Sequence, residues 1–445
     1  MFIIILKRNI LVTITLLFFT FLPLHSGQIE DSPFPFTHFQ LKNGLNVILA
    51  EDYSFPVVSV AVAYHVGSFH ESEGKSGLAH LLETLMFQGS RNVGRMQHIN
   101  FINRTGGRFD ALTTVDKTIF HQTVPANQLE LVLWLESDRM FSLRITREKV
   151  ERAKQSLIDG IRFRKLDDPY MSSSLYFNQL LFGDYSYNHP VIGFETDLRS
   201  LSLQDVRSFY SNYYRPNNSV ICIAGHIDKV RTRELVEKYF QSIPAGPKLE
   251  ETTKTEFHDI LEDIHFSEKS VSSSPRLYIG YRITSPYSDD YFPMDICSYI
   301  LVKGTTSRLY KRLVIKERLA TSLGGGIEIR KDRAVFKIFV GLNNEVNRAR
   351  CQRAVFSEIN KFISNLVSTK ELAKAKMMLK SNYLSKFATV SGRAVFLANR
   401  FLERNHTEQV YSELNQFLSV TAHRIMIIAN KYFSKHKVIL DIEIR

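Results

Sequence analysis

The order of strands and helices that the sequence predicts in the first half of this chain recurs in the second half. In the first half, the run VVSVAVAYHVGS (residues 57–68) has the β-branched composition of a buried strand and precedes a predicted helix at residues 77–90. In the second half, SPRLYIGYRITSP (residues 274–286) predicts a comparable strand, and a helix begins in the MDICSYIL run that follows. Internal similarity of this kind indicates duplication. The sequence therefore predicts an α+β protein of two homologous domains, each an antiparallel sheet flanked by helices.

The predicted domain boundaries follow changes in composition along the chain. A stretch rich in proline and charged residues, which begins PAGPKLEETTKTEF, predicts a linker at residues 244–268. The first domain then covers residues 36–243, and the second covers residues 269–445. Because 44% of the 445 residues are hydrophobic, both domains have enough apolar side chains for a core.

The first residues of the chain have the order of a secretory signal peptide. A Lys7-Arg8 pair precedes the apolar run ILVTITLLFFTFLPL (residues 10–24), and small residues follow it. This run is shorter than the roughly 20 residues that span a bilayer, so we expect no stable membrane span. The sequence predicts a signal peptide at residues 1–27 and export to a periplasm, with anchoring by an uncleaved leader as the alternative.

The charge of the chain does not indicate a nucleic-acid partner. The formal net charge is +12, but the lysine and arginine residues are scattered and accompany no nucleic-acid-binding motif. The three cysteines are far apart and lack the spacing of a zinc ribbon. We therefore expect an ordinary basic surface and buried thiols.

The stretch GLAHLLETLMFQGS (residues 77–90) combines a helical pattern with residues that can carry chemistry. Its leucines recur at helical spacing and predict a face that packs against the core, formed by Leu78, Leu81, Leu82 and Leu85. His80 and Glu83 lie on the same helix at the spacing of an inverted zinc-peptidase motif. Such a motif needs a second histidine directly after the glutamate, and this chain has Thr84 there.

Long stretches around this helix resemble the pitrilysin, insulinase and mitochondrial-processing-peptidase family of zinc metallopeptidases. The resemblance is strongest at residues 55–93, 106–140 and 189–228, and KGTTSRLY (residues 303–310) resembles a turn in the family's second domain. It extends from about residue 36 to the end of the chain and is greatest for the short bacterial members with two α+β domains. The resemblance therefore implies the same fold as the internal recurrence.

The resemblance also implies roles for individual residues. In the family, two histidines one turn apart and a distal glutamate hold a zinc ion, and the motif glutamate takes the proton of the zinc-bound water. His80 matches the first zinc ligand, and Glu83 matches the catalytic base. Thr84 stands in place of the second histidine, and Gly160 stands at the position of the distal glutamate. The resemblance therefore implies a degenerate set with one of three zinc ligands retained. Asp110 occupies the position of a family asparagine near the active site.

A further pair of family residues is missing from the second half. The family often places an arginine and a tyrosine seven residues apart there, to hold the substrate and the developing oxyanion. The matching positions here are Val314 and Thr321. Arg308 and Tyr310 are present but belong to the S-R-L-Y turn, which is a packing feature. The sequence therefore does not predict which residues bind substrate.

Three hypotheses follow from these residues. The first is an exported, non-catalytic family member that serves as partner subunit of a zinc-bearing homologue, or binds its peptides. The second is an active zinc endopeptidase with an altered ligand set, in which Glu83 remains the general base and zinc is the cofactor. The substitute ligands considered are Asp159, His70, His98, His121 and Asp110. The third is a stand-alone peptide-binding protein.

Overall fold

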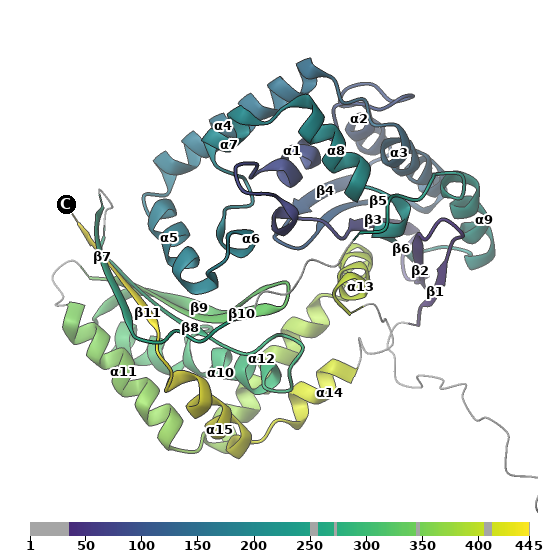
Figure 1. Ribbon diagram of the computed structural model, residues 1–445. Helices are drawn as coiled ribbons and strands as arrows, with labels where there is room; N and C mark the ends of the chain where they lie inside the picture. Colours follow the sequence, from purple (N-terminus) through teal and green to yellow (C-terminus); the bar gives the residue numbers. More distant parts are fainter. Residues whose placement is uncertain (1–34, 250–256, 271–273, 344–347, 405–411, 445) are drawn as a thin grey trace, which may run out of the picture. The chain divides into compact units, whose positions relative to one another are not determined.

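The computed structural model describes residues 35–444, except 250–256, 271–273, 344–347 and 405–411 (Figure 1). The predicted signal peptide, residues 1–27, lies outside the described residues. The described strands form one sheet of six strands, in the order β1-β2-β6-β3-β5-β4, and one of five, in the order β7-β11-β8-β10-β9.

The strands and helices have the following bounds. The first sheet contains β1 Thr37–Gln40, β2 Asn46–Glu51, β3 Val57–Tyr64, β4 Arg108–Thr113, β5 Thr118–Pro125 and β6 Ser219–Gly225. The second contains β7 Ile264–Ser270, β8 Arg276–Arg282, β9 Ala320–Arg330, β10 Arg333–Leu342 and β11 Val438–Ile444. The helices are α1 Leu78–Leu85, α2 Gln97–Arg104, α3 Leu129–Ser142, α4 Arg147–Asp167, α5 Met171–Phe182, α6 Tyr185–Asn188, α7 Glu195–Ser200, α8 Leu203–Tyr213, α9 Lys229–Phe240, α10 Tyr291–Leu301, α11 Arg348–Ser364, α12 Thr369–Ser385, α13 Val390–Arg404, α14 Ser412–Ser419 and α15 Ala422–Phe433.

The two sheets share one topology. Strand β3 is antiparallel to both of its neighbours, β5 and β6, and β8 is antiparallel to β10 and β11. Beyond these, β6 is parallel to β2, and β11 is parallel to β7. A hairpin forms one edge of each sheet, β4–β5 in the first and β9–β10 in the second. The predicted fold of two similar α+β domains is confirmed, with one parallel strand pair in each sheet that the sequence analysis did not predict.

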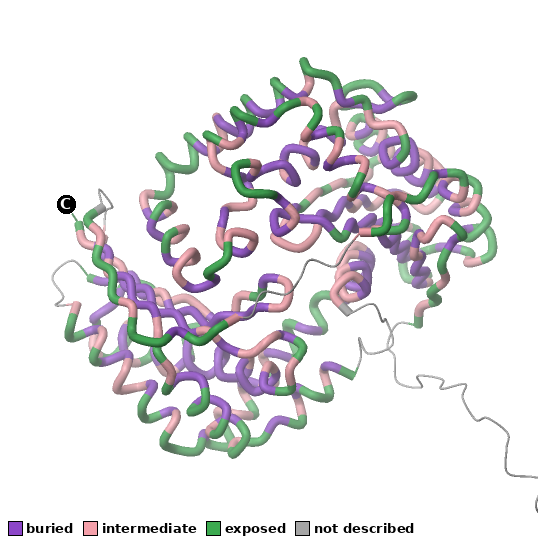
Figure 2. The backbone as a smooth tube through the Cα atoms, viewed as in Figure 1, coloured by how far each residue is buried: buried purple, intermediate pink, exposed green. Residues whose placement is uncertain are grey.

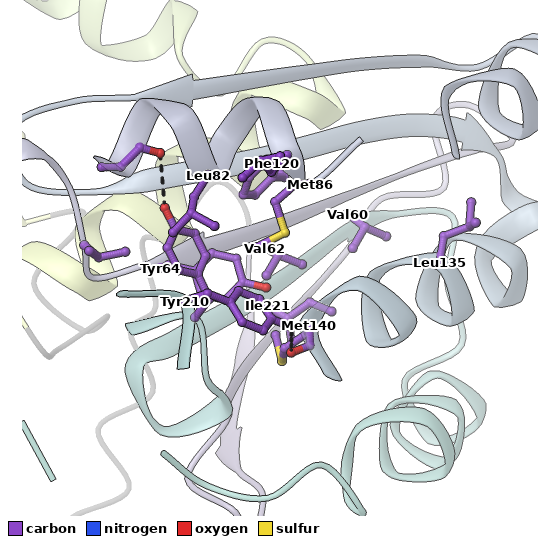
Figure 3. Packing of buried hydrophobic residues seen from close by; sticks show 14 of the residues in the cluster. Val60, Val62, Tyr64, Leu82, Met86, Phe120, Leu135, Met140, Tyr210 and Ile221 are labelled. Carbon is purple, nitrogen blue, oxygen red and sulfur yellow. Dashed lines mark hydrogen bonds between the residues drawn. The ribbon is translucent and has the colours of Figure 1, made fainter. Parts of the chain in front are cut away.

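The first core lies between its sheet and the helices on one face. The central strands β3 and β6 are buried along almost their whole length (Figure 2). Figure 3 shows Leu82 and Met86, from α1 and the residue after it, close to Tyr64, Val62 and Phe120 of the sheet. The predicted leucine face of α1 therefore packs where the sequence placed it, and this packing fixes the position of His80 and Glu83 on the same helix.

Strand β7 overlaps the end of the region predicted as a linker. The prediction assigned residues 244–268 to the linker, whereas β7 spans Ile264–Ser270 and pairs in parallel with β11. Its sequence IHFSEKS is half polar because β7 is an edge strand of the second sheet. Such a strand lacks the apolar run of a central strand, and its composition is that of a loop.

Each sheet is also covered by a helix from the other half of the chain. Helix α13 packs against β3, β5 and β6 of the first sheet. The face of β3 that turns away from the first core carries the small residues Ser59, Ala61 and Ala63, which allow a helix to approach closely. Conversely, α5 of the first half packs against β8, β10 and β11 of the second sheet. The two halves are therefore interlocked, and neither forms all of its packing by itself.

Two further properties bear on the predictions. The cysteines Cys222, Cys297 and Cys351 are all buried thiols without disulfide bonds. None of the helices in the described part of the chain combines the length and the hydrophobicity needed to cross a membrane.

Candidate active-site remnant

Helix α1 is held at its N-terminus by a buried carboxylate. The side chain of Glu71 accepts hydrogen bonds from the backbone N–H groups of Gly77, at 2.7 Å, and Ala79, at 2.8 Å. These are two of the N–H groups that have no partner within a helix. Burial raises the pKa of Glu71 well above its usual value, while the hydrogen bonds from Ala79 and Gly77 oppose this shift. Gly77 has a φ of 92°, a left-handed conformation that favours glycine. The start of the helix is therefore strongly fixed.

His80 and Glu83 are half-buried on the exposed side of this helix. The imidazole of His80 forms no hydrogen bond with any described residue, and its Nδ1 atom is buried. Burial lowers the pKa of His80, the Glu83 charge opposes this effect, and the Arg164 charge adds to it. The Glu83 carboxylate accepts a hydrogen bond from the Thr113 hydroxyl at 2.5 Å. His80 is therefore a neutral imidazole without a partner, whereas Glu83 is tied to the edge strand β4.

The two residues that the resemblance places at further zinc-ligand positions, Thr84 and Gly160, offer no donor to a metal. The Thr84 hydroxyl donates a hydrogen bond to the backbone oxygen of His80, at 3.3 Å, within its own helix. Gly160 lies on α4, which packs against α1, and a Cβ atom added there would meet no neighbouring atom of the described residues within 4 Å. Within the described residues, no group of three or more His, Cys, Asp or Glu side chains could hold a metal ion. A catalytic zinc needs three protein ligands, so these residues do not fit one.

Two of the candidate substitute ligands are histidines with other partners, the half-buried His70 and the buried His98. His70 Nδ1 accepts a hydrogen bond from the Gly67 backbone N–H at 3.2 Å, and burial lowers the pKa of His70 to about 3. His98 Nε2 lies 3.0 Å from the Gln122 side-chain oxygen, and burial lowers the pKa of His98 to about 3 as well. Both side chains are therefore neutral parts of the packed structure.

The remaining candidates also lie in other contacts. His121 Nε2 is 3.8 Å from the Asp110 carboxylate on the neighbouring strand, and its Nδ1 is 3.2 Å from the hydroxyl of Ser391 on α13. The carboxylate of Asp159 accepts a hydrogen bond from Gln155 at 2.8 Å. The structure does not bring any of these residues together with His80 as a metal-binding group.

The residues of the second half that the sequence analysis singled out make contacts within the fold. Val314 packs against the second core, and the Thr321 hydroxyl donates to the Gly341 backbone oxygen at 3.2 Å. Arg308 forms a two-point ion pair with Glu371, with distances of 2.8 and 2.9 Å. Tyr310 begins a π-helical segment, Tyr310–Lys316. The predicted packing role of Arg308 agrees with these contacts.

Two residues near α1 were not found by sequence reasoning. Thr113 holds Glu83, and Arg164 lies one helical turn after Gly160 on α4, where its charge affects His80. The spacing of four residues from Gly160 could have drawn attention to Arg164, since residues at i and i+4 share a helix face. Nothing in the local sequence pairs Thr113 with Glu83, because the contact joins a strand to a helix.

Two family models match this chain. The model described as Insulinase (Peptidase family M16) matches residues 46–163, and the one described as Peptidase M16 inactive domain matches residues 200–379. The first contains α1 with His80 and Glu83, and the second begins in the first half and continues through β7, β8 and the S-R-L-Y turn.

Similarity to known proteins covers most of the chain. It is 28% identical over 407 residues to the zinc protease PqqE of Helicobacter pylori, covering 88% of this chain and 89% of that protein. A crystal structure of a protease from Helicobacter pylori has a TM-score of 0.87 at 25% identity and covers 92% of this chain and 99% of that one. The first half of the periplasmic protease PqqL from Escherichia coli has the same fold, with a TM-score of 0.73 at 17% identity and 92% coverage of both chains.

The duplicated sheets and the helix bearing His80 and Glu83 define the class of two-domain chains with the fold of inverted-motif zinc metallopeptidases. The chain belongs to the insulinase (peptidase M16) family, as its sequence resemblance implied. The resemblance places Thr84 and Gly160 at zinc-ligand positions, and neither residue supplies a donor to a metal.

Proposed function

We propose that this protein is a non-catalytic member of the family that binds peptides or serves as partner subunit of an active zinc peptidase. The observation that carries the proposal is the donor set around His80: the Thr84 hydroxyl bonds within its own helix, and Gly160 has no side chain. A neutral imidazole and one carboxylate already bound to Thr113 make a poor zinc site.

Strand β4 supports a peptide-binding role. It is one of the two edge strands of the first sheet and pairs only with β5 among the described strands. It also contacts α1, so an extended peptide added beside it would run past His80 and Glu83. Main-chain hydrogen bonds to an exposed sheet edge are a common mode of peptide recognition.

Metal analysis of the purified protein tests the proposal. We expect far less than one zinc per chain after equilibration with zinc and removal of unbound metal, and the same content in His80→Ala. Stoichiometric zinc that is lost in His80→Ala would contradict the non-catalytic assignment.

An active zinc endopeptidase with an altered ligand set is the second candidate. The observation that favours it is the survival of both His80 and Glu83, with Glu83 fixed by Thr113 on an intact helix. In that case Glu83→Gln lowers peptide cleavage about 10²-fold or more, because a general base contributes on this order. Glu73→Gln, at an exposed position in the preceding loop, is the matched control.

The partner and the compartment are tested separately. Co-expression with a homologous chain that carries a complete H-x-x-E-H, encoded beside this one, is expected to give a complex of both chains by size-exclusion chromatography. A monomer under these conditions favours the stand-alone peptide-binding protein. The predicted leader and the periplasmic relative support export, and fractionation of cells that express the full chain tests it.

A further inference from the structure

Helix α4 leaves an open space on the side where a zinc ligand would stand. A Cβ atom added at Gly160 would meet no neighbouring atom of the described residues within 4 Å, although α4 packs against α1. Gly160 is also partly exposed, so solvent or a ligand can reach it. The helix therefore offers room for a small group beside α1 without any rearrangement of side chains.

Arg164 brings a positive charge to this space. It follows Gly160 by one helical turn, and residues at i and i+4 share a helix face. Its side chain is exposed and forms no hydrogen bond or ion pair with the described residues. By contrast, its neighbour Arg162 is paired with Glu195 at 2.7 Å. Helix α4 packs against α1, and the Arg164 charge adds to the lowering of the His80 pKa by burial.

Helix α1 adds a hydrogen-bond donor next to α4. The neutral imidazole of His80 has one N–H donor and no partner among the described residues, whereas the Thr84 hydroxyl and the Glu83 carboxylate are both engaged. A guanidinium and an imidazole donor around an open space suit a carboxylate, because an arginine binds carboxylate oxygens through two parallel hydrogen bonds.

An exposed apolar side chain lies next to Arg164 in the chain. Phe163 is 67% exposed and directly precedes Arg164. It is a large hydrophobic residue on α4, which contacts α1. A ligand that fits would therefore combine a carboxylate with an apolar side chain, as a peptide does.

We propose that Arg164, His80 and the space at Gly160 form a binding site for a carboxylate group of a peptide, at its C-terminus or on an acidic side chain. The guanidinium of Arg164 supplies the positive charge that a metal ion would otherwise bring to this position. It binds the peptide but does not catalyse its hydrolysis. This inference rests on the proposed non-catalytic function.

Fluorescence anisotropy with three fluorescein-labelled peptides tests the proposal. The first ends in Ala-Leu-Phe with a free carboxylate, the second has the same sequence with an amide end, and the third is amidated and carries one internal glutamate. We expect the wild-type protein to bind the free acid about tenfold more tightly than the amide, because hydrogen bonds between charged groups are the strong ones. Tight binding of the third peptide shows that a side-chain carboxylate suffices, and weak binding restricts the site to the chain end.

Variants on α4 test whether the preference for the free-acid peptide over the amide arises from this site. Arg164→Gln is expected to remove the preference for the acid, and Lys165→Gln, the adjacent exposed lysine, to keep it. Gly160→Glu should also remove the preference for the acid, since the new glutamate carboxylate would fill the space and pair with Arg164 at i+4. Gly160→Ala is the matched control that leaves the space open. Circular dichroism verifies that each variant is folded.

Two results would overturn the inference: equal or undetectable binding of acid and amide by the wild-type protein, or equal losses in Arg164→Gln and Lys165→Gln. Zinc content is measured in the same preparations. Stoichiometric zinc refutes the proposed non-catalytic function, whereas equal affinities in zinc-free protein refute only the carboxylate site.

Discussion

At the scale of single residues, the two residues that the resemblance places at further zinc-ligand positions are Thr84 and Gly160. Thr84 follows Glu83 directly and lies one turn after His80, and Gly160 faces open space on the adjacent helix. The leucine face of α1 is packed as in an intact helix, and Thr113 still holds Glu83. The packed helix and the fixed Glu83 are therefore present, whereas Thr84 and Gly160 supply no donor to a metal.

Introducing the two ligand side chains that the family has at these positions should create a metal site. We expect the double variant Thr84→His/Gly160→Glu to bind about one zinc per chain, because two histidines at i and i+4 and a glutamate complete a three-ligand set. Zinc is measured by inductively coupled plasma mass spectrometry, with His80→Ala added to the double variant as the control. A folded double variant without zinc would show that the backbone frame has changed as well.

Another residue-scale prediction concerns Glu371 and acid stability. The Arg308 hydrogen bonds lower the pKa of Glu371 from 4.5 to about 2. A depressed carboxyl pKa contributes stability above the unfolded-state value, and this contribution is lost as the pH falls from about 4.5 towards 2. Glu371→Gln should therefore cost about 1 kcal/mol at pH 7, the scale of a partly exposed pair.

Urea denaturation between pH 7 and pH 3 checks the pH dependence. The difference in unfolding free energy between wild type and Glu371→Gln should shrink as the pH falls. Glu358→Gln, whose carboxylate pairs with Arg312 at a longer 3.3 Å, is the control for the loss of a charge in the same region. A difference that stays constant with pH would show that the mutation acts through packing.

At the scale of elements, α4 carries a glycine that its structure does not require. A mid-helix glycine costs up to about 1 kcal/mol relative to alanine, and a Cβ atom at Gly160 has room. Gly160→Ala should therefore raise the unfolding free energy by up to about 1 kcal/mol in chemical denaturation. Gly280→Ala should lower it, because a Cβ atom there would lie 2.5 Å from Leu181 Cδ1. Equal effects of the two substitutions would contradict this account.

Elements also explain which parts of the structure could be predicted. The leucine spacing placed α1 correctly, because one apolar face at helical period has only one favourable orientation. Strand β7 was missed because about half of its residues are polar, a composition that an edge strand shares with a loop. For the site, spacing and resemblance located His80, Glu83, Thr84 and Gly160. Arg164 was missed because an exposed charge on a helix usually only meets solvent.

At the scale of the whole molecule, the exchange of helices between the halves is the feature that sequence reasoning could not supply. An amphipathic pattern shows that a helix buries one face, but it does not show which sheet covers that face. Helix α13 belongs by sequence to the second half and packs on the first sheet. Its buried Arg393 pairs with Asp52 of the first half at 2.9 Å.

This exchange predicts that the first half does not fold stably by itself. Expressed alone, residues 36–243 would expose the small-residue face of β3 and the Asp52 carboxylate that α13 covers. We expect this fragment to bind the dye ANS and to unfold at lower urea concentrations than the full chain. Co-expression with residues 257–445 should recover a soluble complex of both fragments. If residues 36–243 alone matched the stability of the full chain, the contacts of α13 would be dispensable, and the two halves would be joined without depending on each other.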